Sequence, residues 1–84
     1  VKEYLKMTTL SVSYKKLWIL LIDKKMSKAD LRRAADIASN TLTKLRKDEE
    51  VSMTVLKKIC ECLDCNIGDI CDFIRIEKSE VSPK

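Results

Sequence analysis

The chain has 84 residues, which is enough for one small domain. Its composition, 45% hydrophobic and 36% charged with one Gly and one Pro, excludes a disordered chain and favours helices over a turn-rich sheet protein. The sequence contains no His, which excludes Ser–His and Cys–His catalysis. Its longest apolar run, residues 17–22, is far shorter than the roughly 20 residues that cross a bilayer, and residues 1–12 lack the pattern of a secretory signal. We therefore expect a cytoplasmic protein.

The net charge of +4 conceals a division along the chain. Residues 1–47 hold 12 basic and 4 acidic side chains, a net charge of +8, whereas residues 48–84 hold 5 basic and 9 acidic side chains, a net charge of −4. This asymmetry favours a basic face for a polyanion, with an acidic remainder that keeps the protein in solution or contacts a partner. The plainer interpretation is that Lys and Arg only solvate helices.

The first predicted helix spans residues 14–25, with Ser13 as its N-cap. Its inward apolar stripe consists of Leu17, Trp18, Leu20 and Leu21. Ile19 points away from this stripe and Ile22 is at its margin. The two are therefore a candidate dimer contact, although single exposed apolar residues are ordinary on monomers.

Two short helices separated by a turn are predicted next. Ser27 is a typical N-cap for a helix over residues 28–35. Asp36 tolerates the left-handed conformation that a tight turn needs, and Ile37 is expected to return to the core. The following helix spans residues 39–47. Its inward residues are Ala38, Leu42 and Leu45.

A fourth helix is predicted after the polar residues 48–50, with Ser52 as its N-cap. Its core-facing stripe consists of Leu56, Ile59, Cys60 and Leu63. After a turn at residues 66–68, residues 69–73 are predicted as a short fifth helix. Residues 73–76 also have the alternation of a short strand, so this alternative stays open.

The predicted organisation is an all-α domain of five helices over residues 13–76. Residues 1–12 are interpreted as an N-terminal arm or an artificial remnant. Residues 77–84 are interpreted as a flexible tail.

The second and third predicted helices have the outline of a helix-turn-helix unit, in which the second helix of the pair enters the major groove of DNA. On a helical wheel, the side of residues 39–47 opposite the apolar residues is polar and basic, and this stretch contains no acidic residue. Asn bonds adenine in two places, Lys reaches guanine or phosphate, and Thr offers a hydroxyl and a methyl group. The candidate base-reading residues are Ser39, Asn40, Thr43 and Lys44.

Phosphate contacts are assigned to basic residues near this reading helix. Lys28 begins the preceding helix, whose N-terminus favours anions, and Arg46 and Lys47 follow the reading face. Lys15 and Lys16 on the first helix are further flanking candidates. The acidic residues 48–50 repel a phosphate backbone, so this segment is expected to tilt away from DNA.

Residues 14–74 resemble the Cro/cI-type (xenobiotic-response-element-like) helix-turn-helix repressor family, in its branch of small bacterial and mobile-element regulators. The matching residues are Met26 to Leu31, Ile37, Leu42, Leu45 and the string from Leu56 to Ile70. The resemblance implies a five-helix, lambda-repressor-like domain that binds double-stranded operator DNA, commonly as a homodimer on a palindrome, and regulates transcription. Arg32 and Asp36 stand where the family usually has a small residue and a turn glycine.

Four cysteines, at positions 60, 62, 65 and 71, match the number of thiolates in a structural zinc site. The helical wheel argues against such a site, because Cys60 shares the inward stripe of its helix and Cys62 lies about 200° away. Reduced thiols are favoured over a metal site or a redox switch, and Cys62 is the thiol expected to be exposed. We expect no metal, cofactor or small-molecule effector.

Together these features predict a sequence-specific, DNA-binding transcriptional regulator. The alternative is a protein-interaction module on the same fold, such as an antitoxin-like or adaptor protein, which would use Ile19, Ile22 and the acidic second half. The sequence has no motif for a phosphate loop, for metal-dependent hydrolysis or for an activated nucleophile. We therefore do not expect an enzyme.

Overall fold

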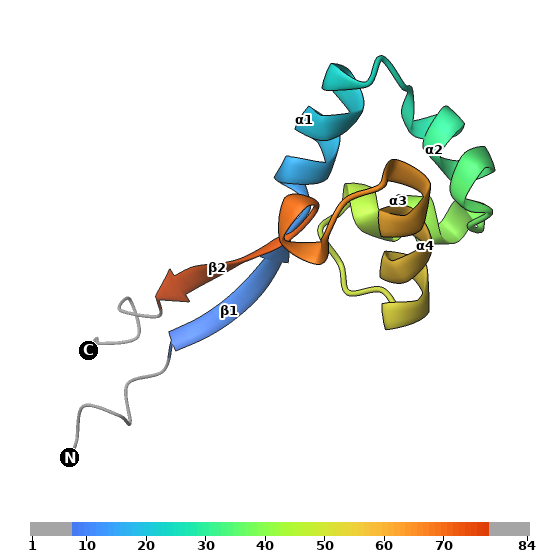
Figure 1. The fold of residues 1–84 in the computed structure, drawn as a ribbon. Coiled ribbons are helices and arrows are strands. Elements are labelled where there is room, and N and C mark those ends of the chain that lie inside the picture. The colour runs from blue at the N-terminus through green and yellow to red at the C-terminus, as the bar shows by residue number, and fades with distance from the viewer. Residues whose placement is uncertain (1–7, 78–84) are drawn as a thin grey trace, which may run out of the picture.

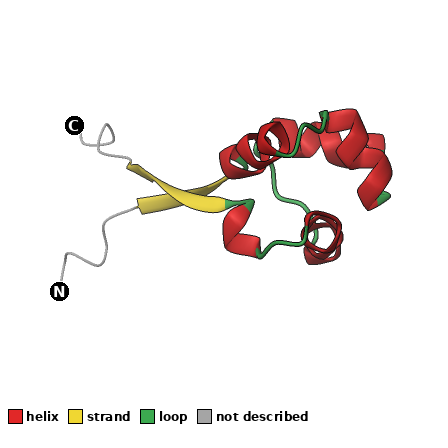
Figure 2. Cartoon of the chain, turned by 45° about the horizontal axis from the view of Figure 1, so that its top comes forward, coloured by secondary structure: helices red, strands yellow, loops and turns green. Residues whose placement is uncertain are grey.

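A computed structural model describes residues 8–77 of the chain. In this part, a helical body contains α1 (Lys15–Asp23), α2 (Lys28–Ala35), α3 (Ser39–Arg46) and α4 (Met53–Leu63). A short 3₁₀ helix, η2 (Ile67–Asp69), follows α4, and two strands, β1 (Thr8–Ser13) and β2 (Asp72–Glu77), form a ribbon. Figures 1 and 2 show this ribbon extending away from the helical body.

The core lies between the helices, and each of them contributes to it. The side chains that are buried almost completely are Tyr14, Leu17, Leu31, Leu45, Ile59 and Ile70. The inward stripes predicted for α1 and α4 are therefore confirmed, with Trp18 and Leu20 only partly buried. In α3 the prediction holds for Leu45, whereas Ala38 is exposed because it precedes the helix as its N-cap residue.

Serine side chains begin two of the helices as predicted. Ser27 Oγ accepts a hydrogen bond from the backbone N–H of Asp30 at 3.0 Å, and a carboxylate oxygen of Asp30 accepts one from the N–H of Ser27 at 3.0 Å. Ser52 Oγ accepts a hydrogen bond from the N–H of Val55 at 3.2 Å. Ser13 is not the N-cap of α1, because Tyr14 occupies that position.

The helices end on residues with a left-handed backbone. Lys25, Asp36, Asp48 and Asp64 have φ values of 58°, 56°, 58° and 53°, and each directly follows the last turn of a helix. Such positions usually hold Gly, but Gly68, the one glycine of the chain, has no positive φ. Asp is among the few side chains that tolerate this conformation, so the prediction for Asp36 is confirmed.

The ribbon pairs the two ends of the described chain. β1 and β2 are antiparallel, with Leu10 opposite Arg75 and Val12 opposite Phe73. The prediction of a fifth helix over residues 69–73 is therefore wrong, and the alternative of a short strand is confirmed. The capping box of Asn66 starts only one helical turn, after which the alternating side chains of β2 favour pairing with β1.

The fold is thus mostly helical with one two-stranded sheet, and not purely α. α1 is shorter at both ends than the predicted residues 14–25, and α3 ends one residue earlier than predicted. β1 lies within the segment that was interpreted as an arm, where no strand was predicted. The rest of that arm and residues 78–84 of the predicted tail lie outside the described residues. Within residues 8–77, none of the helices has the length and apolar character to cross a membrane.

Candidate nucleic-acid interface

The reading unit consists of α2, a short turn and α3. Asp36 begins the turn with its positive φ, and the next residue, Ile37, is buried in the core. Lys58 of α4 donates a hydrogen bond from Nζ to the carbonyl oxygen of Asp36 at 3.2 Å. The turn that sets α3 against α2 is therefore held by one buried side chain and by one hydrogen bond from a third helix.

The outward side of α3 carries the four side chains that are predicted to read bases. Ser39, Asn40, Thr43 and Lys44 are all exposed, while Leu45 on the opposite side is fully buried. Asn40 and Lys44 are one helical turn apart, so their side chains can reach neighbouring base pairs in one groove. The structure thus brings these four residues together on one surface.

Thr43 differs from the other three because its hydroxyl is engaged within the helix. Thr43 Oγ1 donates a hydrogen bond to the carbonyl oxygen of Ser39 at 3.2 Å. Its methyl group and an oxygen lone pair remain for a base. At the start of α3, the N-cap residue Ala38 has no side chain that can accept a hydrogen bond. The N–H of Thr41 donates to the carbonyl oxygen of Ala38 at 3.1 Å, and those of Ser39 and Asn40 remain as donors for an anion.

Lys28 is exposed at the first position of α2, where it meets an aromatic ring. Its Nζ lies 4.8 Å from the centre of the Trp18 ring, a cation–π contact that holds the ammonium group beside the helix start. The N-terminus of α2 is already occupied by the carboxylate of Asp30, which accepts a hydrogen bond from the N–H of Ser27. Hydrogen bonds from the N–H and the hydroxyl of Ser27 hold the pKa of Asp30 below its usual 3.8. Lys28 therefore offers its own charge rather than an open helix N-terminus.

The acidic residues after α3 hold the structure together. The backbone N–H of Tyr14 donates a hydrogen bond to Oδ1 of Asp48 at 3.1 Å, and the Tyr14 hydroxyl donates one to the carbonyl oxygen of Glu49 at 2.9 Å. Tyr14 is also the single residue between β1, which ends at Ser13, and α1, which begins at Lys15. The root of the ribbon is therefore fastened to the end of α3. The sequence analysis did not predict this role of Tyr14. The only local signal was Asp48, which directly follows the predicted helix over residues 39–47.

Residues 16–75 match the Cro/C1-type helix-turn-helix DNA-binding domain. The chain belongs to this family. Among solved structures, the transcriptional regulator VanUg is similar, with 49% sequence identity and a TM-score of 0.78 over 80% of this chain and 89% of that chain. None of the curated proteins compared with this chain matches it. The family is one of DNA-binding domains and not of enzymes, in agreement with the sequence prediction.

Not every predicted contact of this Cro/C1-type domain is free for DNA. Arg46 and Lys47 are exposed at the C-terminal end of α3. Lys16, in contrast, donates a hydrogen bond from Nζ to the carbonyl oxygen of Gly68 at 3.2 Å and lies 3.7 Å from a carboxylate oxygen of Asp72. The flanking role proposed for Lys16 thus competes with its role in joining α1 to β2.

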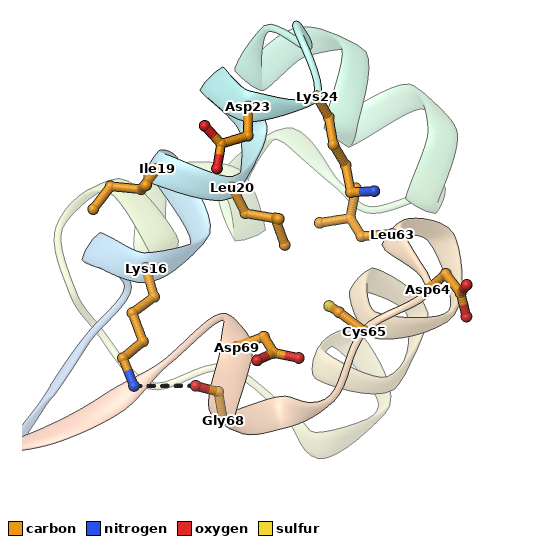
Figure 3. A pocket seen from close by; sticks show the side chains of 10 residues that line it. All are labelled: Lys16, Ile19, Leu20, Asp23, Lys24, Leu63, Asp64, Cys65, Gly68 and Asp69. Carbon is orange, nitrogen blue, oxygen red and sulfur yellow. Dashed lines mark hydrogen bonds between the residues drawn. The ribbon is translucent and has the colours of Figure 1, made fainter.

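The predicted dimer contact lies on the outer side of α1, where Ile19 and Ile22 are exposed. Ile19 borders a hollow of about 390 Å³ between α1 and the segment that follows α4 (Figure 3). Charged side chains of both signs line this hollow, namely Lys16, Asp23, Lys24, Asp64 and Asp69. Its mixed charge suits neither a polyanion nor an apolar partner.

The four cysteines of the domain are free thiols, and all of them are partly buried. The prediction that Cys62 is the exposed one is therefore wrong, because it packs against the core like the others. Burial, followed by the nearby thiol of Cys60, raises the pKa of Cys65 to about 11, so this thiol is protonated at neutral pH. Within residues 8–77, no group of three or more Cys, Asp or Glu side chains is arranged to hold a metal ion.

Proposed function

We propose that this protein is a sequence-specific transcriptional regulator that reads operator DNA by placing α3 in the major groove. One observation carries the proposal: the exposed side of α3 has polar and basic side chains and no carboxylate, while its other side is buried. A helix face that serves only for solubility would mix both charges. The 49% identical neighbour VanUg is a transcriptional regulator, which supports the same activity.

Each residue of the reading face has a role in the proposal. Asn40 bonds an adenine in two places, and Lys44 bonds a guanine or a phosphate. Thr43 contributes its methyl group to a thymine methyl, because its hydroxyl proton is committed to Ser39. Ser39 lies at the helix start, the end that normally meets the bases.

Phosphate contacts position the helix and carry no sequence information. Arg46 and Lys47 supply them at one end of α3, and Lys28 supplies another from the start of α2. The N–H groups of Ser39 and Asn40 at the start of α3 are further donors. We propose that the protein acts as a homodimer in the cytoplasm, with two copies of α3 on half-sites roughly 34 Å apart.

The test compares binding of the protein to the DNA that flanks its own gene and to scrambled duplexes of the same length, at several salt concentrations. Asn40→Ala should weaken binding to the operator by about 1–3 kcal/mol and binding to scrambled DNA much less. Lys47→Ala should weaken binding to both and reduce the salt slope by about one. Lys24→Ala, at the residue that follows α1, removes the same charge outside the reading unit, so it should leave the salt slope unchanged.

Two results would contradict the proposal. Folded Asn40→Ala and Lys44→Ala variants that retain full discrimination would show that α3 is not the reader. Failure of the unmodified protein to bind any duplex at low salt would favour the protein-interaction module instead, because phosphate contacts alone give measurable binding under that condition.

A further inference from the structure

A large apolar groove lies between the ribbon and α4. Its volume is about 950 Å³, and its lining includes Leu10 and Phe73 from the ribbon, Met53 and Leu56 from α4, and Ile67. The side chains of Leu10, Met53 and Phe73 remain 54%, 65% and 70% exposed. Together with Ile67, which is 39% exposed, they form an apolar surface of the kind that marks an interaction site on a soluble protein.

The ribbon itself lacks a cover on both faces. Because neighbouring side chains of a strand point to opposite faces, Leu10, Val12 and Phe73 share the face toward the groove, while Ile74 and Ile76 lie on the other face, also exposed. Apolar residues on both faces are typical of a strand that is buried on both sides. A two-stranded ribbon alone is marginally stable in water, so its stability depends on what packs against it.

We propose that a second copy of this chain covers the groove, so that two ribbons pack face to face about a two-fold axis. The inference rests on the proposed function, in which the regulator is a dimer, and it identifies the interface. It replaces the predicted contact through Ile19 and Ile22, which lie on α1 and do not line this groove.

The charges around the groove favour a second copy over another occupant. Arg75 shares the face of Leu10 and Phe73 and lies farther along the ribbon. The charged residues that line the groove nearer the helical body are Glu50, Asp72 and Lys57, so this end is acidic on balance. A two-fold axis reverses this order, so Arg75 of each copy faces Glu50 of the other. The surface thus has an apolar centre with complementary charges at its rim, as a self-complementary interface requires.

The interface would also fix the reading helices, because Tyr14 fastens the ribbon to the end of α3 by two hydrogen bonds. Pairing of the ribbons would therefore set the separation of the two copies of α3.

The experiment measures the mass of the full chain in solution by sedimentation equilibrium at micromolar concentrations. We expect a dimer whose dissociation constant rises about 30-fold or more in Phe73→Asp, as for the loss of a central aromatic anchor. The matched control is Ile22→Asp, which introduces the same charge at a side chain that is 74% exposed on α1 and should leave the dimer intact. Circular dichroism should show both variants folded, since neither side chain is in the core.

A charge exchange gives the second test. Glu50→Arg and Arg75→Glu should each weaken the dimer, and the double variant should recover most of the loss. A monomeric unmodified chain would overturn the inference. So would a dimer that dissociates in Ile22→Asp and persists in Phe73→Asp.

Binding to DNA separates this inference from the proposed function. If both are right, monomeric Phe73→Asp retains weak, salt-dependent binding to a single half-site and loses the tight binding to the full operator. If a ribbon dimer forms and binds no duplex, the interface stands and the function falls. If the protein binds its operator and Phe73→Asp binds it equally tightly, the function stands and the interface falls.

Discussion

The hydroxyl of Tyr14 joins the ribbon, α1 and the end of α3, and its removal is a direct test of that junction. Tyr14 is only 1% exposed, and its hydroxyl donates a hydrogen bond of 2.9 Å to the carbonyl oxygen of Glu49. Tyr14→Phe removes this hydrogen bond while the ring still fills the core. The variant therefore measures the hydrogen bond without the cavity that Tyr14→Ala would create.

The expected loss follows from the surroundings of the two atoms. One hydrogen bond contributes about 0.5–1.5 kcal/mol to stability, and Glu49 is exposed, so water can partly satisfy its carbonyl oxygen in the variant. We expect Tyr14→Phe to lower the free energy of unfolding by about 1 kcal/mol, which corresponds to a fall of roughly 4–8 °C in Tm for a domain of this size.

The pH dependence gives the prediction a second, independent readout. Burial, followed by the nearby Cys71, Asp48 and Glu50, raises the pKa of Tyr14 above its usual 10.0. The phenol therefore ionises more readily in the unfolded chain than in the folded one. Its contribution to stability is complete below pH 10 and is lost as the pH rises toward the pKa of the folded state, at up to about 1.4 kcal/mol per pH unit.

Urea unfolding at pH 7, 9 and 10.5, followed by circular dichroism, tests both parts. The unmodified protein should be more stable than Tyr14→Phe by the same amount at pH 7 and 9, and this advantage should shrink at pH 10.5. All other titrating groups are common to the two proteins and cancel in the difference. An equal advantage at all three pH values, or none at pH 7, would refute the reasoning.

Three further predictions concern the stability of the protein. Lys25→Gly should stabilise the protein by about 0.5–1 kcal/mol, because Gly adopts the φ of 58° at the end of α1 without strain, whereas Lys25→Ala should give no gain. Ser52→Ala should destabilise it by about 1 kcal/mol, since the N–H of Val55 loses its acceptor; urea titration measures all three variants. A strong chelator should leave Tm unchanged, because within residues 8–77 no three Cys, Asp or Glu side chains are arranged to hold a metal ion.

The parts of the fold that the sequence predicted well are those set by neighbouring residues. The bounds of α2 follow from Ser27 at its start and from Asp36 at its end, and both signals lie within the helix or next to it. The same holds for the start of α4 at Ser52. The polar and basic side of α3 was also visible in advance, because helical periodicity alone assigns its faces.

The parts that the sequence did not predict depend on contacts between distant residues. β1 is polar and short, and it becomes a strand by pairing with β2, more than 60 residues farther along the chain at the open end of the ribbon. A search for local patterns does not detect such a pairing. The cation–π contact between Trp18 and Lys28 and the bonds of Tyr14 to the segment after α3 are of the same kind.

The contacts of the acidic residues also change how the division of charge between the basic first half and the acidic second half is interpreted. Asp48 accepts a hydrogen bond from Tyr14, Asp64 ends α4 with a left-handed backbone, and Asp69 closes the capping box of η2. Asp72 accepts a hydrogen bond from the next N–H and lies near Lys16. These acidic residues of the second half thus stabilise helix ends and turns in a chain with one glycine. Their presence is explained without a binding partner. The exposed side chains of α3 carry no such structural duty apart from the Thr43 hydroxyl, so a basic surface remains there for DNA.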